Sequence, residues 1–195
     1  NLTVTVHDNC FSKANNGRYW EAPREILKKC GCEIIEMKHH KRDSLCCGWG
    51  AGASWTSNFS LMPQILSEGL KKFKEARATG AKAIVCYCEG CNFVLWILRE
   101  MLGYEIDVYH LIEVVRLAMG EKLNHPEDNH ERALDIVAII FYQVILSFFQ
   151  KNFFIKRVKF DREQTSLLQK RFFALKFLRS LLAVSLIRKI FIKLF

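Results

Sequence analysis

The segment AIVCYCEGC, residues 83–91, shows how this chain folds, because an apolar, β-branched run leads directly into a Cys-Glu-Gly-Cys turn. Residues 83–87 are typical of a buried strand, and residues 93–101 continue as a helix. Cys88 and Cys91 therefore follow a strand end. Cys91 lies near a helix N-terminus, where free N–H groups and the helix dipole favour a thiolate. The segment predicts a strand–helix unit with thiols at its junction.

Two earlier segments place cysteines after strands in the same way. Residues 2–6 predict a buried strand, and Cys10 lies just past its end. Residues 32–37 predict a second strand, and the loop that follows carries the adjacent pair Cys46 and Cys47. The gaps between the three groups of thiols are 35 and 40 residues long. Five thiols thus come from three separate segments of the chain.

The remaining elements complete an α/β pattern. Helices are predicted over residues 23–31 and 60–79, and a last strand over 106–109 leads into a helix over 111–119. The order βαβαβαβα predicts a parallel sheet with flanking helices, followed by a helical C-terminal tail. Sites in such sheets form where the carboxyl-terminal loops of the strands meet. We therefore expect the five thiols to form one site.

Several sulfur donors arriving from different segments suit an iron–sulfur cluster or a zinc ion. A tetrahedral zinc ion would use four of the five thiolates. The alternative is that the cysteines fill the core or form disulfides. We interpret Cys86, which lies outside the pattern, as core filler, and assign no function to Cys30 and Cys32.

His7 stands at the end of the first predicted strand. A structural hydrogen bond is the simpler interpretation of a histidine in this place. A catalytic alternative is that His7 hydrogen-bonds a cluster sulfur or protonates a leaving thiolate, since its ordinary pKa suits that work.

Charge is distributed unevenly along a chain that is half hydrophobic and therefore typical of a folded protein. Residues 151–195 carry a net charge of +10, and the rest of the chain carries −1. Residues 133–149 predict an apolar helix that is too short to cross a bilayer. From residue 170 onward, large apolar residues alternate with seven cations and no acids, and the cations do not gather on one helical face.

Three interpretations of this tail remain. It packs on the domain and docks on a partner subunit, it lies in the plane of a membrane surface, or it binds nucleic acid. The third is disfavoured because the basic stretch lacks polar side chains that read bases. We predict a cysteine-rich cluster-binding domain over residues 1–124 and a helical, basic and hydrophobic tail over 125–195. The expected contact of the tail is a partner or a membrane surface, with no nucleic acid.

These motifs resemble the cysteine-rich CCG domain of the heterodisulfide reductase and iron–sulfur oxidoreductase family, over roughly residues 3–120. The similarity extends beyond the cysteines. It includes His7-Asp8-Asn9-Cys10, with Asn9 where the family has Pro, then Trp20-Glu21-Ala22-Pro23-Arg24, Glu36-Met37 with Arg42, Ser44-Leu45-Cys46-Cys47-Gly48, Ala76-Arg77-Ala78-Thr79-Gly80-Ala81 and Cys88-Glu89-Gly90-Cys91.

The resemblance implies a thiolate-bound cofactor. By this resemblance, the ligands in this chain would be Cys10, Cys46, Cys47, Cys88 and Cys91, and they would hold a [4Fe-4S] cluster. In the best understood members of the family the cluster is noncubane and breaks a disulfide by one-electron steps. Other members hold a conventional cluster or a structural zinc. The resemblance also implies partner subunits of a redox complex, a thiol or disulfide substrate, and a cytoplasmic location, at the inner face of the membrane if the tail docks there. The alternative function is a zinc-stabilised assembly module whose tail anchors a respiratory complex to the membrane.

The chain departs from the family pattern in three ways. It has a single CCG unit, whereas many relatives have two units preceded by ferredoxin-type clusters. The gap between Cys47 and Cys88 is longer than usual, which indicates an insertion near residues 53–59. The chain also opens inside a predicted strand, without an initiator Met. We therefore expect a fragment of a longer polypeptide, or a chain from which a leader peptide has been removed. If the whole polypeptide lacks the ferredoxin-type clusters, the domain needs an outside electron donor.

Overall fold

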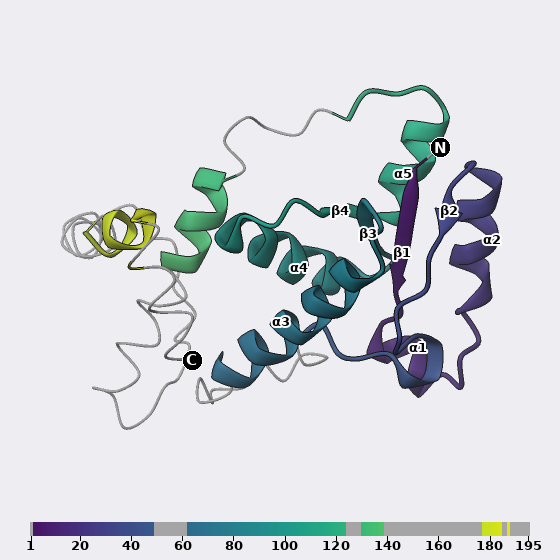
Figure 1. The fold of residues 1–195 in the computed structure, drawn as a ribbon, viewed down its shortest axis with the longest axis horizontal. Coiled ribbons are helices and arrows are strands. Elements are labelled where there is room, and N and C mark those ends of the chain that lie inside the picture. Colours follow the sequence, from purple (N-terminus) through teal and green to yellow (C-terminus); the bar gives the residue numbers. More distant parts are fainter. Residues whose placement is uncertain (1, 49–61, 124–129, 139–176, 185–186, 188–195) are drawn as a thin grey trace, which may run out of the picture.

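A four-stranded parallel sheet forms the centre of the protein, in the order β2-β1-β3-β4 (Figure 1). The computed structural model describes residues 2–48, 62–123, 130–138, 177–184 and 187. The strands are β1 (Thr3–His7), β2 (Glu33–Ile34), β3 (Ala83–Cys86) and β4 (Asp107–His110). This architecture confirms the predicted α/β fold with flanking helices and a helical C-terminal region.

Helices cover both faces of the sheet, with α3 and α4 on one face and α2 and α5 on the other (Figure 1). The helical elements are α1 (Cys10–Ala14), α2 (Glu21–Lys29), the 3-10 turn η1 (Lys41–Asp43), α3 (Met62–Ala78), α4 (Glu89–Leu102) and α5 (Leu111–Ala118). The four longer helices follow the predicted pattern. The short helix α1 was not predicted. Asn9 caps it, because the Asn9 side-chain oxygen accepts the N–H of Ser12 at 2.8 Å.

The alternation of side chains along β1 decides which residues face the candidate site. Val4 and Val6 pack with Leu27 of α2 and Val114 of α5. Successive strand residues point to opposite faces, so His7 points toward the face covered by α3 and α4. His7 is level with Cys86 in the adjoining strand β3.

The edge strand β2 is shorter than predicted. The sequence pattern predicted a strand over residues 32–37, but only Glu33–Ile34 pair as a strand, followed by one more bond from the Ile35 N–H to the Val4 carbonyl. The next residue, Glu36, turns to pair with Arg24 of α2. This ion pair is the physical reason that the ladder stops early.

Gly69 of α3 allows that helix to approach both α4 and the Cys47 loop. A Cβ at this position would lie 2.3 Å from Leu98 Cδ1 and 3.1 Å from the Cys47 carbonyl oxygen. We expect Gly69→Val to lower the free energy of unfolding by about 1–3 kcal/mol through overpacking. Urea denaturation measures this, with Lys74→Val at an exposed position of α3 as the control for the helix propensity of valine. Equal losses in the two variants would contradict the packing argument.

The C-terminal region packs onto α4. Residues 130–138 and 177–183 are helical. They form one apolar cluster with α4, made by Ile97, Met101, Ala133, Leu134, Ala138, Leu178 and Leu182. Arg179 also pairs with Glu131 and Asp135. The helix of residues 130–138 therefore packs on the domain, as in the first of the three interpretations of the tail, and residues 177–183 pack in the same cluster.

The rest of the tail prediction, residues 139–176 and most of 185–195, lies outside the described residues. The same holds for the predicted insertion near 53–59. Within the described part of the chain, no helix combines the length and apolar character needed to cross a membrane.

Candidate metal centre

The candidate site lies where the order of the sheet reverses. The chain passes from β1 to β2 on one side, then crosses to β3 on the other side of β1. The loops after β1 and β3 therefore leave in opposite directions and form the crevice in which α/β sheets bind ligands. Cys10 begins α1 directly after β1, and Cys88 is the N-cap of α4 directly after β3. Cys91 lies in the first turn of α4.

The loop that carries Cys46 and Cys47 is fastened to the end of β1. Ser44 Oγ donates to the Asp8 carbonyl at 2.9 Å, and Lys13 Nζ donates to the Ser44 carbonyl at 2.7 Å. The backbone N–H of Lys41 donates to the Asp8 carboxylate at 2.6 Å. These bonds hold the loop beside α1 and so bring it toward Cys10.

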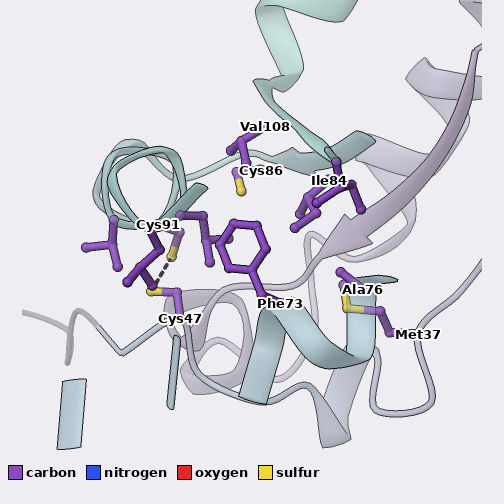
Figure 2. Packing of buried hydrophobic residues seen from close by; sticks show 12 residues of the cluster. Met37, Cys47, Phe73, Ala76, Ile84, Cys86, Cys91 and Val108 are labelled. Atoms are coloured by element: carbon purple, nitrogen blue, oxygen red, sulfur yellow. Dashed lines mark hydrogen bonds between the residues drawn. The ribbon is translucent and has the colours of Figure 1, made fainter. Parts of the chain in front are cut away.

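Two of the five thiols are in contact and buried. Cys47 Sγ lies 3.3 Å from Cys91 Sγ, and the two residues are 2% and 3% exposed (Figure 2). The Gly48 N–H donates to Cys46 Sγ at 3.3 Å. Cys10, Cys46 and Cys88 are partly exposed, and none of the eight cysteines forms a disulfide. The site therefore has a buried side and an accessible side.

The remaining thiols are close enough to influence one another. Burial raises the pKa of Cys10, and the nearby thiols of Cys46 and Cys88 raise it further. The hydrogen bond with Cys47 lowers the pKa of Cys91, but burial and the thiols of Cys86 and Cys88 raise it by more. The prediction that the helix N-terminus makes Cys91 a thiolate is therefore wrong for the metal-free protein. Metal binding must displace these protons.

His7 lies against the buried thiols. A ring nitrogen of His7 and the Sγ atoms of Cys47 and Cys91 all lie within 4.8 Å of one another. Burial lowers the pKa of His7 to about 3, aided by the cation of Lys72 and opposed by Asp8. The ring is therefore neutral at physiological pH. The structural hydrogen bond expected for His7 is missing, since neither ring nitrogen has a partner in the described structure.

A family model described as the CCG cysteine-rich domain matches residues 4–96. Residues 4–96 carry a CCG domain. The matched region includes His7 and all five thiols of the candidate site. The family membership expected from the motifs is confirmed.

Curated relatives of the CCG domain are iron–sulfur oxidoreductases and components of heterodisulfide reductases. A probable membrane-anchored ferredoxin of Chromohalobacter salexigens is 36% identical over 131 residues, 67% of this chain and 19% of that protein. The probable iron-sulfur-binding oxidoreductase FadF of Bacillus subtilis is 41% identical over 135 residues, 62% of this chain and 18% of that protein. One subunit of the dihydromethanophenazine:CoB–CoM heterodisulfide reductase of Methanosarcina barkeri is 32% identical over 122 residues, 62% of this chain and 28% of that protein. The chain thus matches less than a third of the length of each.

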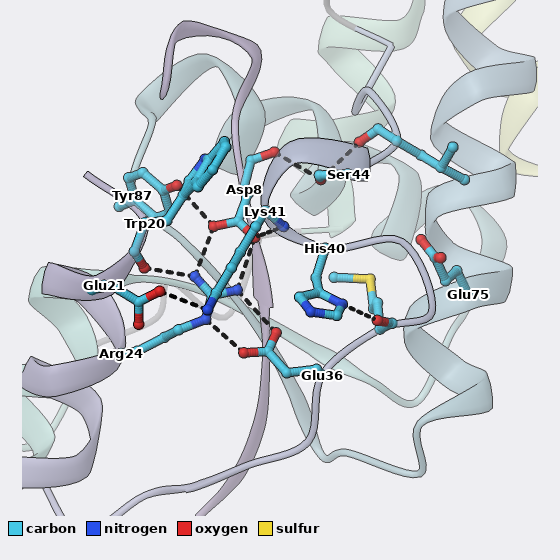
Figure 3. A network of polar contacts seen from close by, with 12 residues as sticks. Asp8, Trp20, Glu21, Arg24, Glu36, His40, Lys41, Ser44, Glu75 and Tyr87 are labelled. Atoms are coloured by element: carbon cyan, nitrogen blue, oxygen red, sulfur yellow. Dashed lines mark hydrogen bonds and ion pairs between the residues drawn. The ribbon is translucent and has the colours of Figure 1, made fainter. Parts of the chain in front are cut away.

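A network of ion pairs and hydrogen bonds around Arg24 supports the CCG domain (Figure 3). The guanidinium of Arg24 donates two bonds to Asp8, at 2.9 and 2.8 Å, and two to Glu36, at 2.5 and 2.9 Å. A fifth bond, of 2.6 Å, reaches the Trp20 carbonyl. Tyr87 OH donates to Asp8 at 3.0 Å. The network therefore links the ends of β1, β2 and β3 through α2.

The charges in this network reinforce one another. Burial by itself would raise the pKa of Asp8, but the bonds from Arg24, Lys41 and Tyr87 outweigh it and the net pKa is lowered. Asp8 is consequently an anion, and it fixes Arg24 as its counter-ion. Asp8, Arg24 and Glu36 all belong to the family motifs, but nothing in their spacing along the sequence shows that they meet.

Lys72 of α3 was missed in the sequence because a lysine in an amphipathic helix is expected to face solvent. Its side chain is fully buried. Its ammonium lies 3.1 Å from Glu75 Oε2, 3.4 Å from Ser44 Oγ and 3.6 Å from Met37 Sδ. The N–H of His39 also donates to Glu75, at 2.6 Å. Burial lowers the pKa of Lys72, and the Glu75 carboxylate opposes that shift and so stabilises the cation. Through Ser44, Lys72 contacts the segment that leads to Cys46 and Cys47.

Glu75→Gln should destabilise the CCG domain by leaving the Lys72 cation without its anion. We expect a loss of about 2 kcal/mol, below the ~3–5 kcal/mol for a fully buried pair, because glutamine can still accept the His39 N–H. Burial would raise the pKa of Glu75, but bonds from His39 and Lys72 lower it below 4.5 overall. The Glu75 carboxylate therefore contributes its full stabilisation above about pH 4.5. This contribution is lost as the pH falls through the lowered pKa of Glu75 in the folded protein.

Denaturation of wild type and Glu75→Gln over a pH series measures this contribution. The stabilities of the two proteins should differ at pH 7 and converge in acid. A gap that stays constant with pH would contradict an electrostatic origin.

Proposed function

We propose that this CCG domain is an electron-transfer unit that holds an iron–sulfur cluster through Cys10, Cys46, Cys47, Cys88 and Cys91. The observation that carries the proposal is the contact between Cys47 and Cys91, 3.3 Å apart and buried at the reversal point of the sheet. The two thiols come from segments 44 residues apart, and the thiols of Cys86 and Cys88 are close enough to raise the pKa of Cys91. A shared metal centre accounts for the cluster of sulfur atoms.

The donor set fits an iron–sulfur cluster. Such clusters are held by cysteine thiolates, and five cysteines exceed the four that a structural zinc site uses. The relatives named as iron–sulfur proteins support the same cofactor.

When bound, the cluster would supply one-electron transfer, and the chain supplies its environment. Burial of Cys47 and Cys91 excludes water from the inner side. The Gly48 N–H, which donates to Cys46 Sγ, would stabilise negative charge on that sulfur. The partly exposed thiols of Cys10, Cys46 and Cys88 leave the outer side open to a partner or substrate.

The substrate that we favour is a disulfide, in line with the relatives named as components of a heterodisulfide reductase. Reduction breaks the S–S bond and yields two thiols, and it consumes two electrons from a donor protein and two protons from solvent. An apolar cavity of about 280 Å³ lies near the start of α1, lined in part by Phe11, which follows Cys10, and by Tyr87, which precedes Cys88; the cysteines themselves do not line it. Such a cavity suits an apolar part of the substrate or partner.

The assembly in which this domain works is part of the proposal. We propose that other subunits or domains of a redox complex deliver the electrons, and that the cluster-binding unit ends near residue 124. The tail beyond it is the segment that would contact a partner or a membrane surface. A reducing cytoplasm suits a site made of free thiols.

Anaerobic purification followed by iron and acid-labile sulfide analysis tests the proposal. We expect several iron and sulfide per chain, broad visible absorbance, and a paramagnetic signal in the oxidised protein that changes when thiol is added. Stoichiometric zinc in a colourless protein would overturn it. That result would favour the alternative function, a zinc-stabilised assembly module.

A further inference from the structure

His7 is a buried side chain whose polar atoms are left without partners. The residue is 1% exposed, and neither Nδ1 nor Nε2 has a hydrogen-bond partner among the described residues. An unpaired buried polar atom costs free energy, so such atoms usually find a partner. Within the described structure His7 is the one residue with two of them on the same side chain. The neighbouring Asp8, by contrast, is paired with Arg24, Lys41 and Tyr87.

The His7 side chain lies close to two of the candidate metal ligands. Residues of β1 alternate between faces, and His7 points toward α3 and α4, where Cys47 and Cys91 meet. A ring nitrogen lies within 4.8 Å of both Sγ atoms, and those atoms lie 3.3 Å apart. Ligands at the usual zinc–nitrogen and zinc–sulfur distances of about 2.0 and 2.3 Å lie roughly 3.5–3.8 Å from one another. The three donor atoms are therefore close enough to bind a common metal centre.

Cys86 is not a donor at the buried side of the site. It is level with His7 in the sheet and fully buried, but it is not one of the three residues whose ligand atoms meet. Its surroundings are those of the apolar cluster that includes Phe73 and Leu95 (Figure 2). The imidazole of His7 is therefore the additional donor at the buried side of the site.

We propose that His7 is a direct ligand of the metal centre, so that one imidazole and the thiolates of Cys47 and Cys91 hold its buried side. This inference rests on the proposed function, and it adds a nitrogen donor to the five thiolates. Imidazole is neutral where thiolate is negative. A nitrogen-ligated iron is consequently easier to reduce, as it is in the iron–sulfur centres that use histidine in place of cysteine.

Pulsed electron paramagnetic resonance on the full chain, reconstituted anaerobically with iron and sulfide, tests the assignment. A nitrogen bound to iron gives a strong hyperfine coupling, whereas a nitrogen that only donates a hydrogen bond to sulfur gives a weak one. We expect a strong coupling that changes when the protein is labelled with ¹⁵N-histidine. It should vanish in His7→Gln and persist in His130→Gln, because His130 is a partly exposed histidine in the helix of residues 130–138 and does not belong to β1.

The labelled wild type gives the answer even if His7→Gln folds poorly. Iron and sulfide in full amount with only a weak nitrogen coupling would overturn the ligand assignment and leave the proposed function intact. Protein that binds no iron would overturn the proposed function instead. In that case cobalt(II) added to the metal-free chain tests the ligand by itself. Its d–d bands should change between wild type and His7→Gln, and unchanged bands would overturn the assignment.

Discussion

Cys47→Ser should remove most of the bound iron and the visible absorbance that accompanies it. Cys47 is 2% exposed, in contact with Cys91, and close to the nitrogen of His7. A serine hydroxyl stays protonated at neutral pH and is a poor ligand for iron, so one of the buried donors is lost. Replacement of residues that only orient ligands already costs about 10–100-fold in metal affinity. We expect a fall in affinity of at least about tenfold, measured as iron and acid-labile sulfide per chain after anaerobic reconstitution.

Two cysteines provide matched controls for this experiment. Cys86→Ser also puts a hydroxyl into the same buried cluster, and it should lower stability but leave the iron content unchanged. Cys30, the C-cap of α2, packs against the other core cluster, so Cys30→Ser should also leave the iron content unchanged. Iron retained in Cys47→Ser would remove Cys47 from the ligand set. Iron lost equally from Cys86→Ser would show that damaged packing, not a missing ligand, is responsible.

Arg24→Leu should cause the largest loss of stability among substitutions outside the thiols. Arg24 is 4% exposed and makes five hydrogen bonds, four of them to Asp8 and Glu36. Its removal leaves the fully buried carboxylate of Asp8 without a counter-ion. Removing one partner of a buried ion pair typically costs about 3–5 kcal/mol, and we expect a loss of that size.

Chemical denaturation of the metal-free proteins measures this loss without interference from the cofactor. Arg116→Leu is the control, because Arg116 makes an exposed ion pair with Glu121 and should cost at most about 1 kcal/mol. Arg24→Lys keeps the charge but cannot make the paired bonds, so its loss should be intermediate. Similar small losses in Arg24→Leu and Arg116→Leu would show that the network contributes little to stability.

The order of the main strands and helices could be predicted from the sequence because the apolar residues in each of them recur with a clear period. The β-branched run at residues 83–87 and the apolar spacing along residues 60–79 depend only on near neighbours. α1 was missed because five residues give too little periodicity. Asn9 was the available signal, since an asparagine before a polar turn is a common helix cap. β2 was overestimated because its end is fixed by the Arg24–Glu36 pair, a contact between distant residues.

Convergence of the thiols at one sheet edge followed from parallel topology, but the finer contacts did not. Period-two alternation could have placed His7 on the face opposite Val4 and Val6. That its nitrogens lack partners is visible only when every neighbour is placed. The burial of Lys72 could not be predicted from the sequence for the same reason. Gly69 and Ala76 lie on the same buried stripe of α3, but the burial of a lysine there depends on Ser44, which is 28 residues away.

The order β2-β1-β3-β4 also bears on how the centre is assembled during synthesis on the ribosome. β1 is made first, yet it occupies the middle of the sheet, and its second neighbour β3 follows about eighty residues later. Cys10, Cys46 and Cys47 therefore emerge well before the helix that carries Cys91. Because the N-terminal part of a chain is exposed while the rest is still being made, these early thiols must be kept reduced until α4 docks. Cofactor insertion is then a late event, which favours delivery to a finished domain over capture by a growing one.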